Sequence, residues 1–162
     1  MKTLAIITAL ALALPLAACN QNTAVGNDRE ARLDPPPKPA PIMGAAQALR
    51  NVATASIKPE TMSDADIAAL GGRKGRCVIK LTEVAFPSFL FEPEGRGAIK
   101  LNGKLVVLPN AGKARYEDAG LLVTLRSVDE EGSAGLKAME MIVVPPQAKD
   151  EIGYRGYVQC YQ

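Results

Sequence analysis

The sequence contains no histidine and no tryptophan. Without histidine, the Ser-His-Asp and Cys-His forms of nucleophilic catalysis and the usual zinc sites are excluded, and the commonest general base is missing. The net charge is also low, because the 19 Lys and Arg residues are nearly balanced by 17 Asp and Glu residues. This balance does not indicate a nucleic-acid ligand. Beyond residue 16, no apolar run approaches the ~18 to 20 residues that a bilayer-spanning helix needs.

The apolar residues that do form a run lie at the N-terminus. Lys2 precedes an apolar stretch over residues 4–16, which is the layout of a secretory signal over residues 1–18. The four residues Leu-Ala-Ala-Cys that end at Cys19 resemble the lipobox of bacterial lipoproteins. That resemblance implies that Cys19 is acylated and becomes the first residue of the mature chain. Asn20, which is not Asp, implies release to the outer membrane, facing the periplasm.

The stretch over residues 19–45 is polar and then rich in proline, with five prolines between positions 35 and 41. Proline fixes φ and lacks a backbone N–H, so this composition favours extended, unpacked chain. We expect a disordered, semi-rigid tether, and a proline-rich peptide ligand is the alternative interpretation.

Two cysteines, Cys77 and Cys160, remain once Cys19 is assigned to the lipid. Disulfides persist in the compartment that the signal implies, so we expect these two to be bridged. Two buried free thiols are the alternative.

Residues 46–75 predict a short helical lead-in. Ser63 is a suitable N-cap, Asp64 and Asp66 fall in the first turn, where the helix dipole favours carboxylates, and Gly71 supplies a stop. One short helix of one to two turns is therefore expected before the strands begin.

Residues 76–162 carry the signals of an antiparallel β domain. The clearest is Asn102-Gly103, the pair best suited to a type I′ turn, and pairing Leu101 with Lys104 would place Ile99 opposite Val106. Strands are predicted over residues 77–84, 98–108 (two strands), 120–128, 136–144 and 154–161. An edge or irregular strand is expected over residues 86–91, and a turn at residues 129–133. The fold class is mainly all-β, a small antiparallel β-barrel or sandwich of about six to seven strands.

Residues with catalytic chemistry are limited to carboxylates in pairs, at positions 92 and 94, 117 and 118, 129 to 131, and 150 and 151. Each pair falls in a predicted turn, so solvated charge is favoured over an acid and base pair. The acidic run at 129–131 lacks the ligand spacing of an EF-hand loop. We expect no enzyme activity, no metal and no cofactor.

Tyrosines offer a large rigid contact with a polar tip, so Tyr116, Tyr154 and Tyr157, with Arg115, are the candidate binding surface. Ordinary packing at the rim of the barrel is the alternative for these side chains.

Two family resemblances extend over this region. The segments at residues 64–70, 75–77, 99–105 and 153–157 resemble a family of uncharacterised bacterial lipoproteins, which implies no known activity. Residues 112–116 and the strand after them resemble, more weakly, the membrane-bound inhibitors of c-type lysozyme, which are small antiparallel β-barrels with a lipobox. Here Ala111 stands at the position of the inhibitory Ser, Lys113 lengthens the spacing by one residue, and the family's Trp is absent.

The sequence therefore predicts a lipid-anchored, non-catalytic lipoprotein of the cell envelope. Its partners would be the membrane, through Cys19, and an envelope protein or a peptidoglycan-related ligand. A lysozyme-inhibitor-like protein that protects peptidoglycan is the alternative function.

Overall fold

The computed structural model describes Pro35, residues 37–132 and residues 135–162. The predicted signal, Cys19 and most of the predicted tether lie outside these residues. Residues 36–162 form one compact unit, which is dominated by strands.

The lead-in contains most of the helical structure of the described residues. This helical part consists of α1 (Ala45–Ala48), the 3-10 turn η2 (Thr54–Ser56) and α2 (Asp64–Ala69). The strands are β1 (Ile42–Met43), β2 (Pro59–Glu60), β3 (Cys77–Lys80), β4 (Phe89–Phe91), β5 (Gly97–Leu101), β6 (Lys104–Leu108), β7 (Asn110–Gly112), β8 (Arg115–Asp118), β9 (Leu121–Glu131), β10 (Lys137–Val144) and β11 (Ile152–Cys160).

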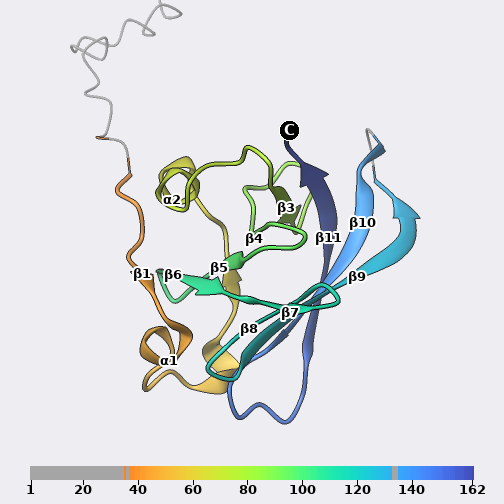
Figure 1. Ribbon diagram of the computed structural model, residues 1–162. Helices are drawn as coiled ribbons and strands as arrows, with labels where there is room; N and C mark the ends of the chain where they lie inside the picture. Colours follow the sequence, from red (N-terminus) through yellow and green to blue (C-terminus); the bar gives the residue numbers. More distant parts are fainter. Residues whose placement is uncertain (1–34, 36, 133–134) are drawn as a thin grey trace, which may run out of the picture. The chain divides into compact units, whose positions relative to one another are not determined.

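These strands form one sheet in the order β1-β6-β5-β4-β3-β11-β10-β9-β8-β7, with β2 paired to β5. Every pair is antiparallel except β1 with β6. The sheet curls into a half-barrel, in which β3, β10 and β11 form the wall opposite α1 (Figure 1). The mainly β fold class is therefore confirmed, but the expected six to seven strands is too few, because very short strands such as β1 and β2 carry no alternation that a sequence window detects.

The inside of the half-barrel holds the main core. Ile79, Phe89, Ile99, Val106 and Val123 are fully buried there, and α1 contributes Ala45 and Ala48. The opposite face of β3 to β6 is covered by α2, which buries Ile67 against Val78, Leu90, Ala98 and Leu105. Both faces of this half of the sheet are thus buried, and its strands read as nearly continuous apolar runs.

The Asn-Gly hairpin forms with the predicted register, since Leu101 pairs with Lys104 and Ile99 with Val106. Asn102 and Gly103 have φ values of 50° and 67°, which is the geometry of a type I′ turn. The short helix is also confirmed: Ser63 is the N-cap of α2, and its side chain and that of Asp66 form a capping box.

Three other expectations are wrong. β4 is not an edge strand, because Pro87 and Pro93 lie outside it and it pairs with both β3 and β5. Residues 129–131 are not a turn, because β9 continues to Glu131. Residues 40–45 are not part of an unpacked tether as expected, because the N–H of Ala40 donates to Asp66 in the domain and β1 pairs with β6.

Candidate functional site

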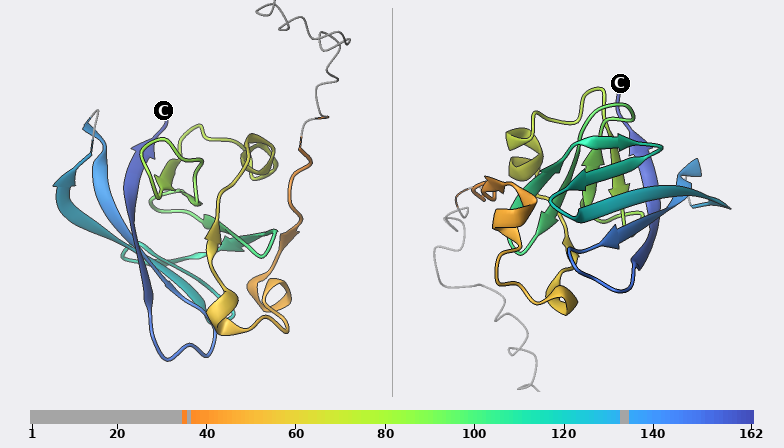
Figure 2. Two further views of the ribbon diagram at one scale, coloured as in Figure 1. Left: turned by 180° about the vertical axis from the view of Figure 1, so that it is seen from behind. Right: turned by 60° about the horizontal axis from the view of Figure 1, so that its bottom comes forward.

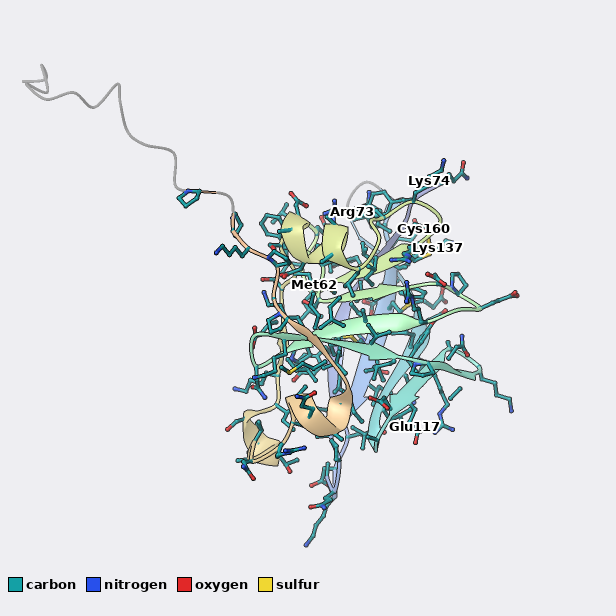
Figure 3. All side chains as sticks on the ribbon, turned by 60° about the vertical axis from the view of Figure 1, so that its left-hand side comes forward. Met62, Arg73, Lys74, Glu117, Lys137 and Cys160 are labelled. Atoms are coloured by element: carbon teal, nitrogen blue, oxygen red, sulfur yellow. A yellow bond between two sulfur atoms is a disulfide. The ribbon has the colours of Figure 1, made fainter. Side chains whose placement is uncertain are left out.

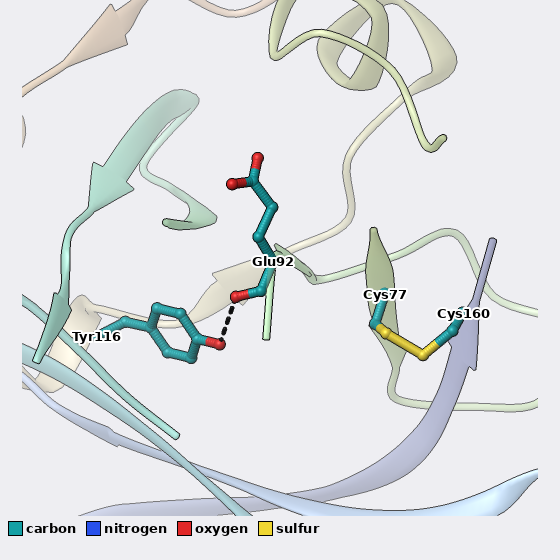
Figure 4. Close-up of a disulfide and its surroundings, with 4 residues drawn as sticks. All are labelled: Cys77, Glu92, Tyr116 and Cys160. Atoms are coloured by element: carbon teal, nitrogen blue, oxygen red, sulfur yellow. Dashed lines mark hydrogen bonds between the residues drawn. A yellow bond between two sulfur atoms is a disulfide. The ribbon is translucent and has the colours of Figure 1, made fainter. Parts of the chain in front are cut away.

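Tyr116 does not belong to a binding surface, which corrects the sequence-based prediction. Its side chain is 0% exposed, and its ring packs edge-on against Phe89 and Phe91 with centroid distances of 5.3 and 6.0 Å. The hydroxyl donates a hydrogen bond to the backbone oxygen of Glu92 at 3.1 Å (Figure 4). Burial, and secondarily the charge of Glu92, raises the pKa of Tyr116. This residue is a structural part of the core.

The other members of the predicted surface do not come together. Tyr154 pairs with Met141 and packs on the inner core, and burial raises its pKa. Tyr157 is an odd number of residues along the same strand, so its side chain lies on the opposite face of the sheet. Arg115 is exposed and pairs with Thr124. These residues therefore share no single surface.

Cys77 and Cys160 form the expected disulfide, which joins β3 to β11 where the two residues pair directly (Figure 4). Cys77 is buried and Cys160 is exposed. The bridge fastens Cys160, the last residue of β11, to Cys77, the first residue of β3, so its role is structural. Cys19, the predicted lipidation site, lies outside the described residues.

Several charges that were expected to be solvated are structural instead. Glu92 pairs with Arg76 at 2.9 Å, and Arg76 also donates to the backbone oxygens of Leu70 and Gly72 after α2. Asp118 accepts a hydrogen bond from the N–H of Ala45 at 2.7 Å, at the start of α1. Among residues 35, 37–132 and 135–162, no group of three His, Cys, Asp or Glu side chains is placed to hold a metal ion.

A hollow between β9 and β10 is the candidate functional site. Ser127 pairs with Met139 and Glu131 with Lys137, so residues 128–130 stand opposite Ala138 alone. A bulge of this kind bends its strand and interrupts the hydrogen bonds to the neighbouring strand. The resulting hollow encloses about 450 Å³. It is lined by Ser127, Val128, Asp129, Glu130, Glu131, Lys137, Ala138, Met139 and Val158.

The floor and rim of this hollow differ in chemistry. Met139 and Val158 are partly buried and continue the apolar inner core into the floor. The rim carries carboxylates and Lys137, which lies at the same end of the domain as Arg73 and Lys74 and far from Glu117 (Figure 3). Glu130 is bonded to Arg155 at 3.2 Å, whereas Asp129 and Glu131 have no ion-pair partner within the described part of the chain.

A second hollow, of about 290 Å³, lies beside α1 and η2. Three residues with positive φ, Asn51, Ala119 and Gln147, contribute to its lining. Each of them lies in a tight connection, which accounts for the backbone conformation without a ligand. The β9–β10 hollow is larger and adjoins unpaired backbone, so it is the stronger candidate.

Sequence reasoning missed this site because its signal is not local. The acidic run at 129–131 is visible, but the bulge depends on how β9 and β10 align across a connection. The only sequence cue is that Val128 interrupts a polar segment.

Comparison with known proteins supplies a family and no activity. No helix in the described ranges is both long and apolar enough to cross a bilayer. No curated protein and no solved structure matches the chain. A family model described as a domain of unknown function, DUF6692, matches residues 15–162. Because that match covers most of the sequence, the chain belongs to the DUF6692 family.

Proposed function

We propose that this protein is a lipoprotein of the cell envelope, acylated at Cys19, whose β domain is a non-catalytic module that binds a partner or serves structurally. The observation that carries the binding role is the β9–β10 hollow. It combines an apolar floor with a charged rim, which is the composition of a recognition site. The lipobox supports the anchor, and Asn20 supports a final place in the outer membrane, facing the periplasm.

The anchor is tested by feeding cells an alkyne analogue of palmitate and comparing the wild-type chain with Cys19→Ala. We expect label and membrane fractionation for the wild type and neither for the variant. Fractionation of Asn20→Asp tests the location, because that change should retain the protein in the inner membrane. Label on Cys19→Ala would contradict acylation at this residue.

Binding at the hollow is tested by placing a photoreactive amino acid at Ser127 and, as a control, at exposed Lys149. A discrete adduct from position 127 and none from position 149 would support a partner at the hollow. Turnover of an envelope substrate by the purified chain would overturn the non-catalytic assignment.

The second candidate function is inhibition of a c-type lysozyme. It is favoured by the β7–β8 hairpin, where residues 111–115, at the position of the inhibitory segment in that family, are all exposed. The buried Tyr116 would then hold the hairpin in place and would not contact the enzyme. Loss of muramidase activity on adding the chain to c-type lysozyme would support this function.

A further inference from the structure

One side of β9 is an open edge. β8 pairs with β9 from Leu121 to Thr124, and the N–H of Leu125 donates to the oxygen of Ala114. Beyond that point, in the part of the chain that the structure describes, no strand pairs with residues 126–131 on the β8 side. The hairpin of β9 and β10 projects past the rest of the sheet, so this edge faces outward (Figure 2).

An open edge presents unpaired N–H and C=O groups to which another extended chain can bond. Residues 126–131 give it a length of six residues, which is that of an ordinary strand. The floor of the hollow, Met139 and Val158, belongs to β10 and β11 on the other side of β9, so a chain bonded to this edge would contact β9 and not the floor.

The charges on the edge restrict what can add to it. Its sequence is Arg-Ser-Val-Asp-Glu-Glu, and the two carboxylates without an ion-pair partner, Asp129 and Glu131, lie on it. Charged edges protect sheets against unwanted strand addition, because a neutral strand leaves them unpaired and an acidic strand is repelled. A basic strand is the one kind that these carboxylates attract.

A second copy of this chain is a poor occupant. Antiparallel pairing of two such edges sets Arg126 against Glu131 and Val128 against Asp129. It brings three carboxylates and only one arginine from each copy into a single seam. No facing pair in this register joins two like charges, but the seam as a whole gathers an excess of negative charge, whose mutual repulsion disfavours self-pairing.

We propose that residues 126–131 of β9 bind an extended basic segment of a partner protein by strand addition. This proposal rests on the proposed binding function and names its partner class. The backbone bonds would supply affinity, and the carboxylates would select for basic side chains.

The test uses the full chain in detergent micelles and a synthetic eight-residue peptide of alternating Lys and Val. Two further peptides carry N-methyl groups on the Lys residues only or on the Val residues only, because an added strand turns just one of these sets of N–H groups toward β9. We expect the parent peptide to bind and to shift the amide resonances of residues 126–131. We expect one methylated peptide to bind at least tenfold more weakly and the other to bind like the parent.

Charge variants complete the test. Asp129→Lys/Glu131→Lys should weaken peptide binding at least tenfold. The matched control Asp150→Lys/Glu151→Lys makes the same change in net charge at another exposed site and should leave peptide binding unchanged.

Equal binding of both methylated peptides, equal effects of the two charge variants, or self-association through the edge in sedimentation would each overturn the proposal. If the peptide fails while the cross-link at position 127 persists, this partner class is wrong and the binding module stands.

Discussion

Lys100 Nζ lies 2.9 Å from Asp66 Oδ2, and the Asp66 side chain is only 1% exposed. The same carboxylate accepts hydrogen bonds from the N–H groups of Ala40, at 2.7 Å, and Ser63, at 2.9 Å. One buried group therefore connects the first residues of the domain, the N-terminus of α2 and β5. Because all the hydrogen bonds of this carboxylate are charge-assisted, Asp66 strongly stabilises the place where the chain enters the domain.

Asp66→Asn should destabilise the domain by about 2 kcal/mol, because it leaves the Lys100 ammonium without its counter-charge. The cost stays below that of a fully buried pair, since Lys100 is 19% exposed and can reach water. Urea unfolding followed by circular dichroism measures this. Asp64→Asn is the matched control, because its pair with Arg73 is exposed and its loss should cost about 0.5 kcal/mol or less. Equal losses for both variants would contradict the role assigned to Asp66.

The stability that Asp66 contributes should disappear in acid. Burial raises the pKa of Asp66, but the hydrogen bonds from Ala40, Lys100 and Ser63 outweigh it and hold this pKa below its ordinary value of 3.8. The folded state therefore favours the ionised form, and the contribution is complete above the ordinary value and lost as the pH falls through the folded pKa. The difference in unfolding free energy between wild type and Asp66→Asn should be constant from about pH 7 to pH 5 and shrink below about pH 4. A difference that grows in acid would be inconsistent with this pairing.

Reduction of the disulfide should lower the melting temperature. The bridge spans a sequence separation of 83 residues, for which the chain-entropy model allows about 4 kcal/mol, and measured values fall below that figure. We expect a loss of about 2 to 4 kcal/mol, and Cys160→Ser should lose as much without reductant. Thermal melts with and without a phosphine reductant measure this. Cys77→Ala/Cys160→Ala is the control, since its melting temperature should not respond to the reductant.

The parts of the fold that the sequence predicted are those with a local cause. The Asn102-Gly103 turn, the N-cap at Ser63 and the shared inner face of the alternate apolar residues of β10 each depend on neighbouring residues, and all three are observed. The disulfide is predicted from the oxidising compartment that the signal implies and from the two cysteines that remain after Cys19. In each case, the relevant physical chemistry acts within a few residues or does not depend on position.

The parts that were missed depend on tertiary pairing. β1 and β2 have two residues each and exist only because β6 and β5 offer them an edge. The amphipathic character of tyrosine predicts Tyr116 at the surface, but Glu92 supplies a backbone acceptor inside the core. The bulge in β9 is a mismatch between two strands. None of these can be read from one segment alone.

Tyr116→Phe should cost about 1 kcal/mol, because it removes one hydrogen bond to the Glu92 oxygen, which still accepts from the N–H of Gly95, and keeps the aromatic packing. Tyr116→Ala should cost about 3 to 5 kcal/mol, since it also leaves a cavity beside Phe89 and Phe91. Chemical denaturation measures both, with exposed Arg115→Ala as the neutral comparison. A Tyr116→Phe variant as unstable as Tyr116→Ala would show that the hydroxyl matters more than packing.

The β7–β8 turn offers a stabilising change. Lys113 and Ala114 have φ values of 52° and 56°, so they form the two central positions of a turn that normally takes Asn and Gly. A side chain with a Cβ is strained at such φ values, by about 1 to 2 kcal/mol for an ordinary residue. Lys113→Asn/Ala114→Gly should therefore raise the unfolding free energy by about 1 kcal/mol, as measured by urea unfolding. The Asn102-Gly103 turn gives the reciprocal control, because Asn102→Lys/Gly103→Ala should lower stability by a similar amount. If the engineered hairpin is no more stable, strain at Lys113 and Ala114 is relieved by contacts other than the turn.

Lysozyme inhibition measured on the same variant then tests the second candidate function, because removing Lys113 from the exposed segment should abolish inhibition only if this hairpin contacts the enzyme.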